Sequence, residues 1–210
     1  MNAQVLKGGA LLILLLTLFS SWGLLQEKVS PKACDAAISA LASYQIDHPE
    51  EHPHFLAVVD YSKPSYLKRM VLIDLKTKER SFYRVSHGIH SGDLYARQFS
   101  NTINSNMSSL GLFKILDIYT GDHGKALRLG GLDITLNSNA SKRDIVLHSA
   151  QYVSWGFILM NLVTFNGPMI GRSNGCFVIS SHDLEDVIQK LNKGAFLYAW
   201  TDQPSRPINE

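Results

Sequence analysis

The sequence predicts a mainly β domain with a few flanking helices, an α+β fold. Short apolar runs bounded by Gly, Asn, Asp, Ser or Pro recur through the middle of the chain, and helical spacing is limited to a few short segments. The chain has 210 residues, of which 45% are hydrophobic and 18% are charged. This length and composition fit one globular domain with a substantial core.

Strand-like runs make up most of the expected domain. Each places apolar or β-branched residues over a few positions and ends at a turn-forming residue. The expected strands cover residues 55–60, 69–75, 81–86, 111–119, 126–129, 145–148 and 196–200, and the apolar run 177–179 continues a strand that begins at Cys176.

Helical spacing marks the remaining elements. Small and apolar side chains share one face over residues 31–44, and residues 154–162 predict a second, shorter helix. Ser180, with Asp183 three residues later, resembles a capping box that opens a third helix, which Gly194 closes.

The N-terminal segment is typical of an export signal. Lys7 precedes an uncharged stretch over residues 8–25, whose length lies between that of a signal-peptide core and the roughly 20 residues of a membrane span. Ser21-Trp22-Gly23 presents small residues at the two positions that a signal peptidase recognises. A cleaved signal and a retained anchor both stay open, and we expect the protein in the periplasm or cell envelope. A buried core helix is disfavoured because the stretch has no polar face.

The charge pattern excludes nucleic acid as a partner. The formal net charge is +2, and Lys and Arg are scattered without a run that would line a phosphate backbone. Contact with the inner membrane is expected only through the N-terminal segment, if that segment is retained.

Cys34 and Cys176 are the two cysteines of the chain. An oxidising envelope favours disulfides. However, Cys34 directly follows the targeting segment, whereas Cys176 lies far away in a glycine-flanked turn. We therefore expect two thiols with no bond between them.

Cys176 stands at the start of a strand, directly after the turn Gly171-Arg172-Ser173-Asn174-Gly175. Glycines on this approach let the backbone turn sharply and come close to a substrate carbonyl. The amides of Gly175 and Cys176 could then face a developing oxyanion. A buried, inert cysteine is the alternative, because many cysteines without disulfides only fill space.

His148 ends the apolar run 145–147, where a purely structural position would favour another aliphatic residue. If this strand end lies beside Cys176, the imidazole can take the thiol proton and later return it to a leaving amine. If His148 is considered without Cys176, the alternative is a core or surface histidine whose hydrogen bonds are satisfied locally and which has no catalytic role.

The order of these motifs resembles the murein L,D-transpeptidase catalytic domain of the YkuD-like type, over about residues 55–200. The matching segments are Val85-Ser86-His87-Gly88, Ser91-Gly92, Phe99-Ser100-Asn101, Ser108-Ser109-Leu110-Gly111, Leu127-Arg128-Leu129-Gly130-Gly131-Leu132, Arg143-Asp144-Ile145-Val146-Leu147-His148-Ser149-Ala150-Gln151-Tyr152-Val153 and Gly171-Arg172-Ser173-Asn174-Gly175-Cys176.

The resemblance implies a β-sandwich or barrel catalytic domain and the following division of the chain. Residues 1–25 are a signal peptide or anchor, 26–53 a helical lead-in and linker, 54–201 the catalytic domain and 202–210 a tail.

The resemblance also implies roles for the site residues. Cys176 is the nucleophile, His148 the base, Gly175 part of the catalytic turn, and the carbonyl of Ser173 or a nearby residue orients the imidazole. Arg172 could hold a stem-peptide carboxylate through its planar fork. The other expected substrate-binding residues are Asn174, His87, Ser149 and Tyr152.

Two positions depart from the family's usual pattern. Asn174 stands where the family has His or Trp, and Phe177 stands where Pro or Ile is more usual. Neither carries a reacting atom, so these departures bear on substrate preference more than on activity.

The implied reaction is an attack by Cys176 on the bond between the third residue of a peptidoglycan stem peptide and its terminal D-alanine. D-Alanine leaves, a thioester forms, and an amine of a neighbouring stem resolves it. If water resolves it instead, the enzyme is an L,D-carboxypeptidase. An envelope module that binds peptidoglycan without catalysis is a third hypothesis. No metal or organic cofactor is implied.

A zinc site built from His87, His90, Asp93 and His123 is a competing interpretation. Two histidines three positions apart do not face the same way on a strand, and the spacing fits no strong zinc pattern. We therefore expect no metal, with His87 either lining the active-site floor beside Ser108 or Ser109 or holding a loop network.

Overall fold

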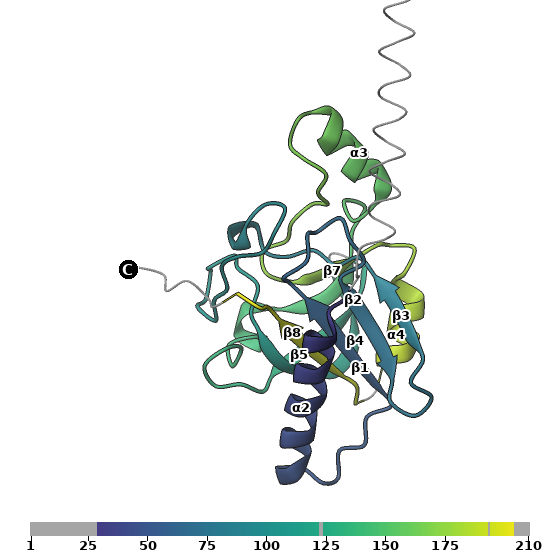
Figure 1. Ribbon diagram of the computed structural model, residues 1–210. Coiled ribbons are helices and arrows are strands. Elements are labelled where there is room, and N and C mark those ends of the chain that lie inside the picture. The colour runs from purple at the N-terminus through teal and green to yellow at the C-terminus, as the bar shows by residue number, and fades with distance from the viewer. Residues whose placement is uncertain (1–28, 122–123, 193, 204–210) are drawn as a thin grey trace, which may run out of the picture.

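The computed structural model describes residues 29–121, 124–192 and 194–203 (Figure 1). The predicted signal or anchor over residues 1–25 and His123 lie outside the described residues. Within the described ranges, no helix is long and apolar enough to cross a membrane.

The elements follow one another in a mainly β order. They are α2 (Pro31–Asp47), β1 (Phe55–Asp60), β2 (Met70–Asp74), β3 (Arg80–Tyr83), the 3-10 helix η1 (Ile89–Ser91), β4 (Gly111–Gly121), β5 (Gly124–Gly131), the 3-10 helix η2 (Ser141–Arg143), β6 (Val146–Ser149), α3 (Trp155–Val163), β7 (Phe177–Ile179), α4 (Leu184–Leu191) and β8 (Phe196–Trp200).

One eight-stranded sheet carries the fold, in the order β3-β2-β1-β8-β4-β5-β6-β7. The β1–β8 and β6–β7 pairs are parallel. The two ends of the sheet meet, because the Ser86 amide donates to the Val178 carbonyl at 2.8 Å and the Ser173 amide donates to the His87 carbonyl at 3.0 Å. The sheet is thus a nearly closed barrel, which confirms the predicted fold class.

The core explains which side chains of β6 and β7 are available for chemistry. Leu147 of β6 pairs with Phe177 of β7, and both side chains are fully buried in the main apolar core. Neighbouring strand residues point to opposite faces. His148 and Val178, the next pair along, therefore face away from that core.

Helix α2 covers the outer face of the sheet at β1 and β8, as the apolar face of residues 31–44 predicted. Ser30 caps it, since its hydroxyl accepts from the Ala33 amide at 3.3 Å, and Pro31 occupies the first helical position. Cys34 is one of the buried residues of this helix, and no disulfide joins it to Cys176.

The expected helix at 154–162 is α3, which Ser154 caps through a hydrogen bond from the Phe157 amide, 3.3 Å long. The predicted capping box at Ser180 is wrong. Asp183 is the residue that precedes the first turn of α4, and the Ser180 carbonyl accepts from the Asp183 amide at 3.0 Å in a turn after β7. The strands at 55–60 and 196–200 have the predicted bounds.

Candidate active site

Cys176 and His148 line one cleft of about 510 Å³. The parallel register of β6 with β7 explains their proximity, because Leu147 stands opposite Phe177, the residue that follows Cys176. Cys176 directly precedes β7 and His148 is the third residue of β6, so the paired strands carry the thiol and the imidazole on the face that lines the cleft.

The walls of this cleft come from the tip of the β4–β5 hairpin, from β6 and from the turn before β7. The lining residues are Tyr119, Gly121, Gly124, Ala126, Asp144, Val146, His148, Ala150, Tyr152, Arg172, Ser173, Asn174 and Cys176. Of the predicted substrate-binding residues, Arg172, Asn174 and Tyr152 are in this set, whereas Ser149 and His87 are not.

The turn before Cys176 is fixed by the Ser173 side chain. The Ser173 hydroxyl accepts from the Gly175 amide at 3.1 Å and donates to the Cys176 carbonyl at 2.7 Å. The Gly175 amide therefore points at Ser173 and not into the cleft, which corrects the expectation that it faces an oxyanion.

Gly175 itself has a φ of 120°, a backbone conformation that favours glycine. A Cβ at this position would lie 2.8 Å from the Met107 carbonyl oxygen and 3.1 Å from a guanidinium nitrogen of Arg143. A glycine is thus needed both for the conformation and for the close approach of the neighbouring loop.

The environment of the Cys176 thiol has opposing effects on its pKa. Burial raises the pKa above the usual cysteine value, and a backbone hydrogen bond from Val146 and the charge of Arg143 counter that effect. The net shift is upward, so the group rests mainly as a thiol. Chemistry at the sulfur therefore needs a nearby base.

His148 has the protonation geometry of a base. Its side chain is buried, and Nδ1 lies 3.1 Å from the Ser149 carbonyl oxygen. A carbonyl only accepts, so Nδ1 carries the proton in this bond and Nε2 is the basic nitrogen of the neutral ring. The carbonyl that contacts the imidazole is thus that of Ser149. The Ser173 carbonyl, which was the first candidate for this contact, instead accepts from the Ile89 amide at 2.7 Å.

Arg172 lies in the cleft wall and forms an ion pair with Asp93. Its Nη1 also donates to the Gly92 carbonyl at 3.2 Å. The Asp93 side chain is 76% exposed, which leaves this pair open to exchange with solvent. Arg172 is therefore placed so that a substrate carboxylate could replace Asp93.

His87 is fully buried and does not line the cleft. The expectation that it contacts substrate is therefore corrected. Arg69 Nη2 lies 2.7 Å from Nδ1, and the Gly92 carbonyl lies 3.0 Å from Nε2. Because an arginine only donates, Nδ1 is the acceptor and Nε2 carries the proton. Burial and the charge of Arg69 lower the pKa of His87 to about 3. Both ring nitrogens are engaged, which also removes His87 as a zinc ligand.

Arg143 is the main site residue to which sequence reasoning gave no role. Its guanidinium donates to the Ser100 carbonyl at 2.6 Å and to the Ser105 hydroxyl at 3.2 Å, and it also contacts the Met107 carbonyl and the Ser109 hydroxyl. It thereby fixes the loop 100–109 against the catalytic turn. The sequence shows Arg143 at the start of the motif that contains His148. It does not reveal the role of Arg143, because the hydrogen-bond partners lie more than 30 positions earlier in the chain.

Comparison with known protein families gives a match over most of the chain. The family described as the L,D-transpeptidase catalytic domain, YkuD_2, matches residues 25–200. No curated protein and no solved structure matches significantly.

Proposed function

This chain belongs to the L,D-transpeptidase catalytic domain family, and from that premise we propose that it is a cysteine acyl-transferase that uses Cys176 and His148 on peptidoglycan stem peptides. Membership of the family gives a function of the peptidoglycan L,D-transpeptidase type. The observation that carries the finer proposal is the shared cleft, which the thiol and the imidazole line from the same face of two paired strands.

The first step forms a thioester. His148 Nε2 takes the proton from the Cys176 thiol, and the thiolate attacks the carbonyl of the third stem residue. The protonated imidazole then gives its proton to the nitrogen of the terminal D-alanine, which leaves. The raised pKa of Cys176 makes this proton transfer necessary at neutral pH.

The second step returns the enzyme to its starting state. An amine of a neighbouring stem attacks the thioester while His148 removes its proton, and the sulfur leaves as a thiolate that is reprotonated. This gives a 3-3 cross-link or a related attachment. Water in place of the amine gives an L,D-carboxypeptidase.

Arg172 is proposed to hold a carboxylate of the donor stem. The guanidinium is already charged, lies in the cleft wall and has an exposed partner, Asp93, that a substrate carboxylate can replace. We infer in addition that residues 8–25 export the protein to the envelope, where this substrate lies.

The proposal is tested by incubating the purified chain with a disaccharide-tetrapeptide and analysing the products by mass spectrometry. We expect 3-3 dimers and free D-alanine from the wild type and neither from Cys176→Ala. Cys34→Ala is the matched control, because Cys34 is buried away from the cleft. Tripeptides without dimers would establish the carboxypeptidase.

A second measurement addresses the alternative of a binding module without catalysis. A carbapenem should acylate Cys176 of the folded protein, with a mass increase that His148→Gln slows strongly. Absence of both turnover and acylation in a folded protein would contradict the proposal.

A further inference from the structure

Helix α3 and the turn after it project from the barrel (Figure 1). They also expose a row of large apolar side chains. Trp155, Leu159 and Val163 lie four positions apart, so they share one helical face. The exposed members of the row are Trp155 (58%), Leu159 (50%), Met160 (49%), Val163 (68%) and Phe165 (96%). Ile158 and Asn161 point the other way and are buried.

This projection is ordered and not a loose loop. Asn161 Nδ2 donates to the Met169 carbonyl at 2.9 Å, and the Asn166 amide donates to the Asn161 carbonyl at 2.8 Å. Phe165 has a φ of 60°, which is unfavourable for a bulky residue. The fold therefore holds a strained aromatic residue in an almost fully exposed position, against both backbone preference and the hydrophobic effect.

The segment also lacks charge. Residues 151–171 contain no Asp, Glu, Lys or Arg. An exposed protein surface usually mixes both signs of charge, whereas a helix that is apolar on several faces is typical of burial or of a lipid environment. An exposed apolar patch of this kind marks a contact with another apolar surface.

The start of the described chain lies at the same end of the barrel as α3. The Ser30 amide donates to Asp60 Oδ2 at 2.8 Å, and Asp60 is the last residue of β1. In the loop that follows β1, Tyr66 and Leu67 pack in one apolar cluster with Ile158 of α3. Residue 29, at which the described part of the chain begins, therefore lies on the side from which α3 projects.

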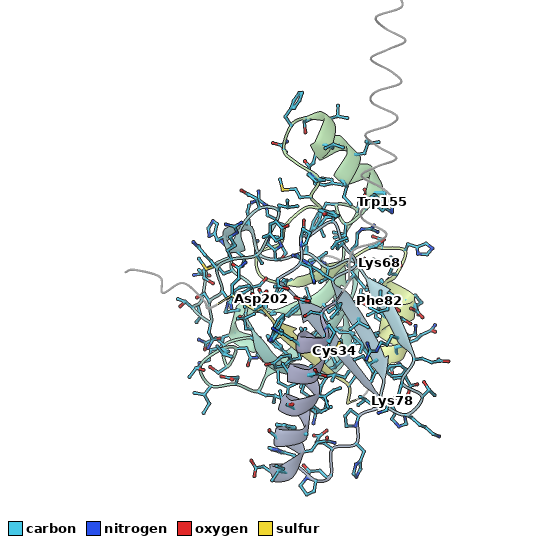
Figure 2. All side chains as sticks on the ribbon, in the orientation of Figure 1. Cys34, Lys68, Lys78, Phe82, Trp155 and Asp202 are labelled. Carbon is cyan, nitrogen blue, oxygen red and sulfur yellow. The ribbon has the colours of Figure 1, made fainter. Side chains whose placement is uncertain are left out.

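We propose that the exposed face of α3 and the turn at Phe165 dock onto a phospholipid membrane surface, with these apolar side chains entering the acyl region. Trp155 is of the residue type enriched at membrane interfaces, because its ring is amphipathic. The Arg84 guanidinium lies over this ring at 4.1 Å from the centroid. Lys68, labelled in Figure 2, is exposed and follows Leu67, which packs with Ile158 of α3, so its charge lies at this end of the barrel and suits anionic headgroups. This contact is separate from any anchoring by residues 8–25, and it fixes the orientation of the cleft relative to the membrane.

The test uses the full chain in vesicles of phosphatidylethanolamine and phosphatidylglycerol, with brominated acyl chains as quenchers. Trp22→Phe removes the tryptophan of the N-terminal segment, and the difference between this chain and its Trp155→Phe derivative isolates the Trp155 emission. We expect brominated lipid to quench most of that emission. Replacing Leu159, Met160, Val163 and Phe165 by Gln should abolish the quenching while turnover of the tetrapeptide in solution stays unchanged.

A control tryptophan is placed by Ile134→Trp in the chain that lacks Trp22 and Trp155. Ile134 is 85% exposed in the loop after β5 and should remain unquenched by lipid. Equal lipid quenching at both positions, or none at Trp155, would overturn the proposal. Shielding of Trp155 from aqueous acrylamide without lipid quenching, together with cross-links between copies, would assign α3 to a dimer and also overturn it.

Discussion

Cys176 Sγ lies 3.4 Å from the carbonyl oxygen of Asp144, the residue whose left-handed backbone, with a φ of 51°, leads into β6. A carbonyl accepts from a thiol but repels a thiolate. The contact therefore favours the resting thiol, while Val146 and Arg143 favour the charged form. The sulfur thus sits between groups that stabilise each of its two states.

The first prediction concerns the pH at which this thiolate forms. Because the pKa of Cys176 is raised, its alkylation by iodoacetamide should be slower at pH 7 than that of an unhindered cysteine and should rise with pH beyond the usual cysteine range. Arg143→Gln removes a nearby positive charge and should move the profile to still higher pH. Alkylation at pH 7 should become about tenfold slower for each unit by which the pKa of Cys176 rises.

Arg143→Lys distinguishes the effect of the positive charge near Cys176 from the effect of the hydrogen bonds that hold the loop 100–109. Lysine keeps the charge but cannot form the forked contacts with Ser100 and Met107. We expect it to restore most of the pH profile while lowering the melting temperature as much as Arg143→Gln does. Identical pH profiles for both variants would show that Arg143 acts only by positioning the loop.

The second prediction concerns Gly175. Gly175→Ala should strain the backbone and push against the Met107 carbonyl, so it should lower turnover strongly and cost more than about 2 kcal/mol of folding free energy. Gly167→Ala is the matched control, because Gly167 also has a positive φ, of 82°, but open space around it. The free energy of unfolding of that variant, measured by denaturant titration, should fall by about 1–2 kcal/mol. Equal losses at both positions would leave no role for the steric contact.

Much of the fold followed from local patterns. The bounds of β1 and β8 were predicted correctly because short apolar runs there end at turn-forming or polar residues. That β6 and β7 adjoin was predicted from chemistry, since a base at His148 can act on Cys176 only if their strands are neighbours; the parallel direction of the pair was not predicted.

The remaining features depend on contacts that no local pattern reveals. His87 looked like an active-site residue, but its environment is set by Arg69, which the barrel places beside it in three dimensions. Ser180 and Asp183 had capping-box spacing, yet the chain still turns after β7 at Ser180, so the helix starts later. The bracing by Arg143 likewise depends on the loop 100–109.

The third prediction follows from the buried His87. Its folded-state pKa is depressed from its usual 6.5 to about 3, so it contributes stability above pH 6.5 that is lost as the pH falls toward 3. The loss is at most about 5 kcal/mol. Melting temperatures across this range should fall less steeply for His87→Gln, which is less stable at pH 7 but has no proton to gain. An unchanged slope would place the acid sensitivity elsewhere.

The fourth prediction concerns the exchangeable pair of Arg172 and Asp93. If a stem-peptide carboxylate must displace Asp93, then Asp93→Asn should lower the KM for the tetrapeptide several-fold and leave kcat nearly unchanged, because the competing anion is gone. Arg172→Lys keeps the charge but loses the planar fork, so its KM should rise by about tenfold. A tetrapeptide amidated at its terminal carboxylate provides the substrate control. If that carboxylate is the one bound, neither variant should change the KM for the amidated substrate, whereas equal effects on both substrates would show that Arg172 shapes the cleft without binding this group.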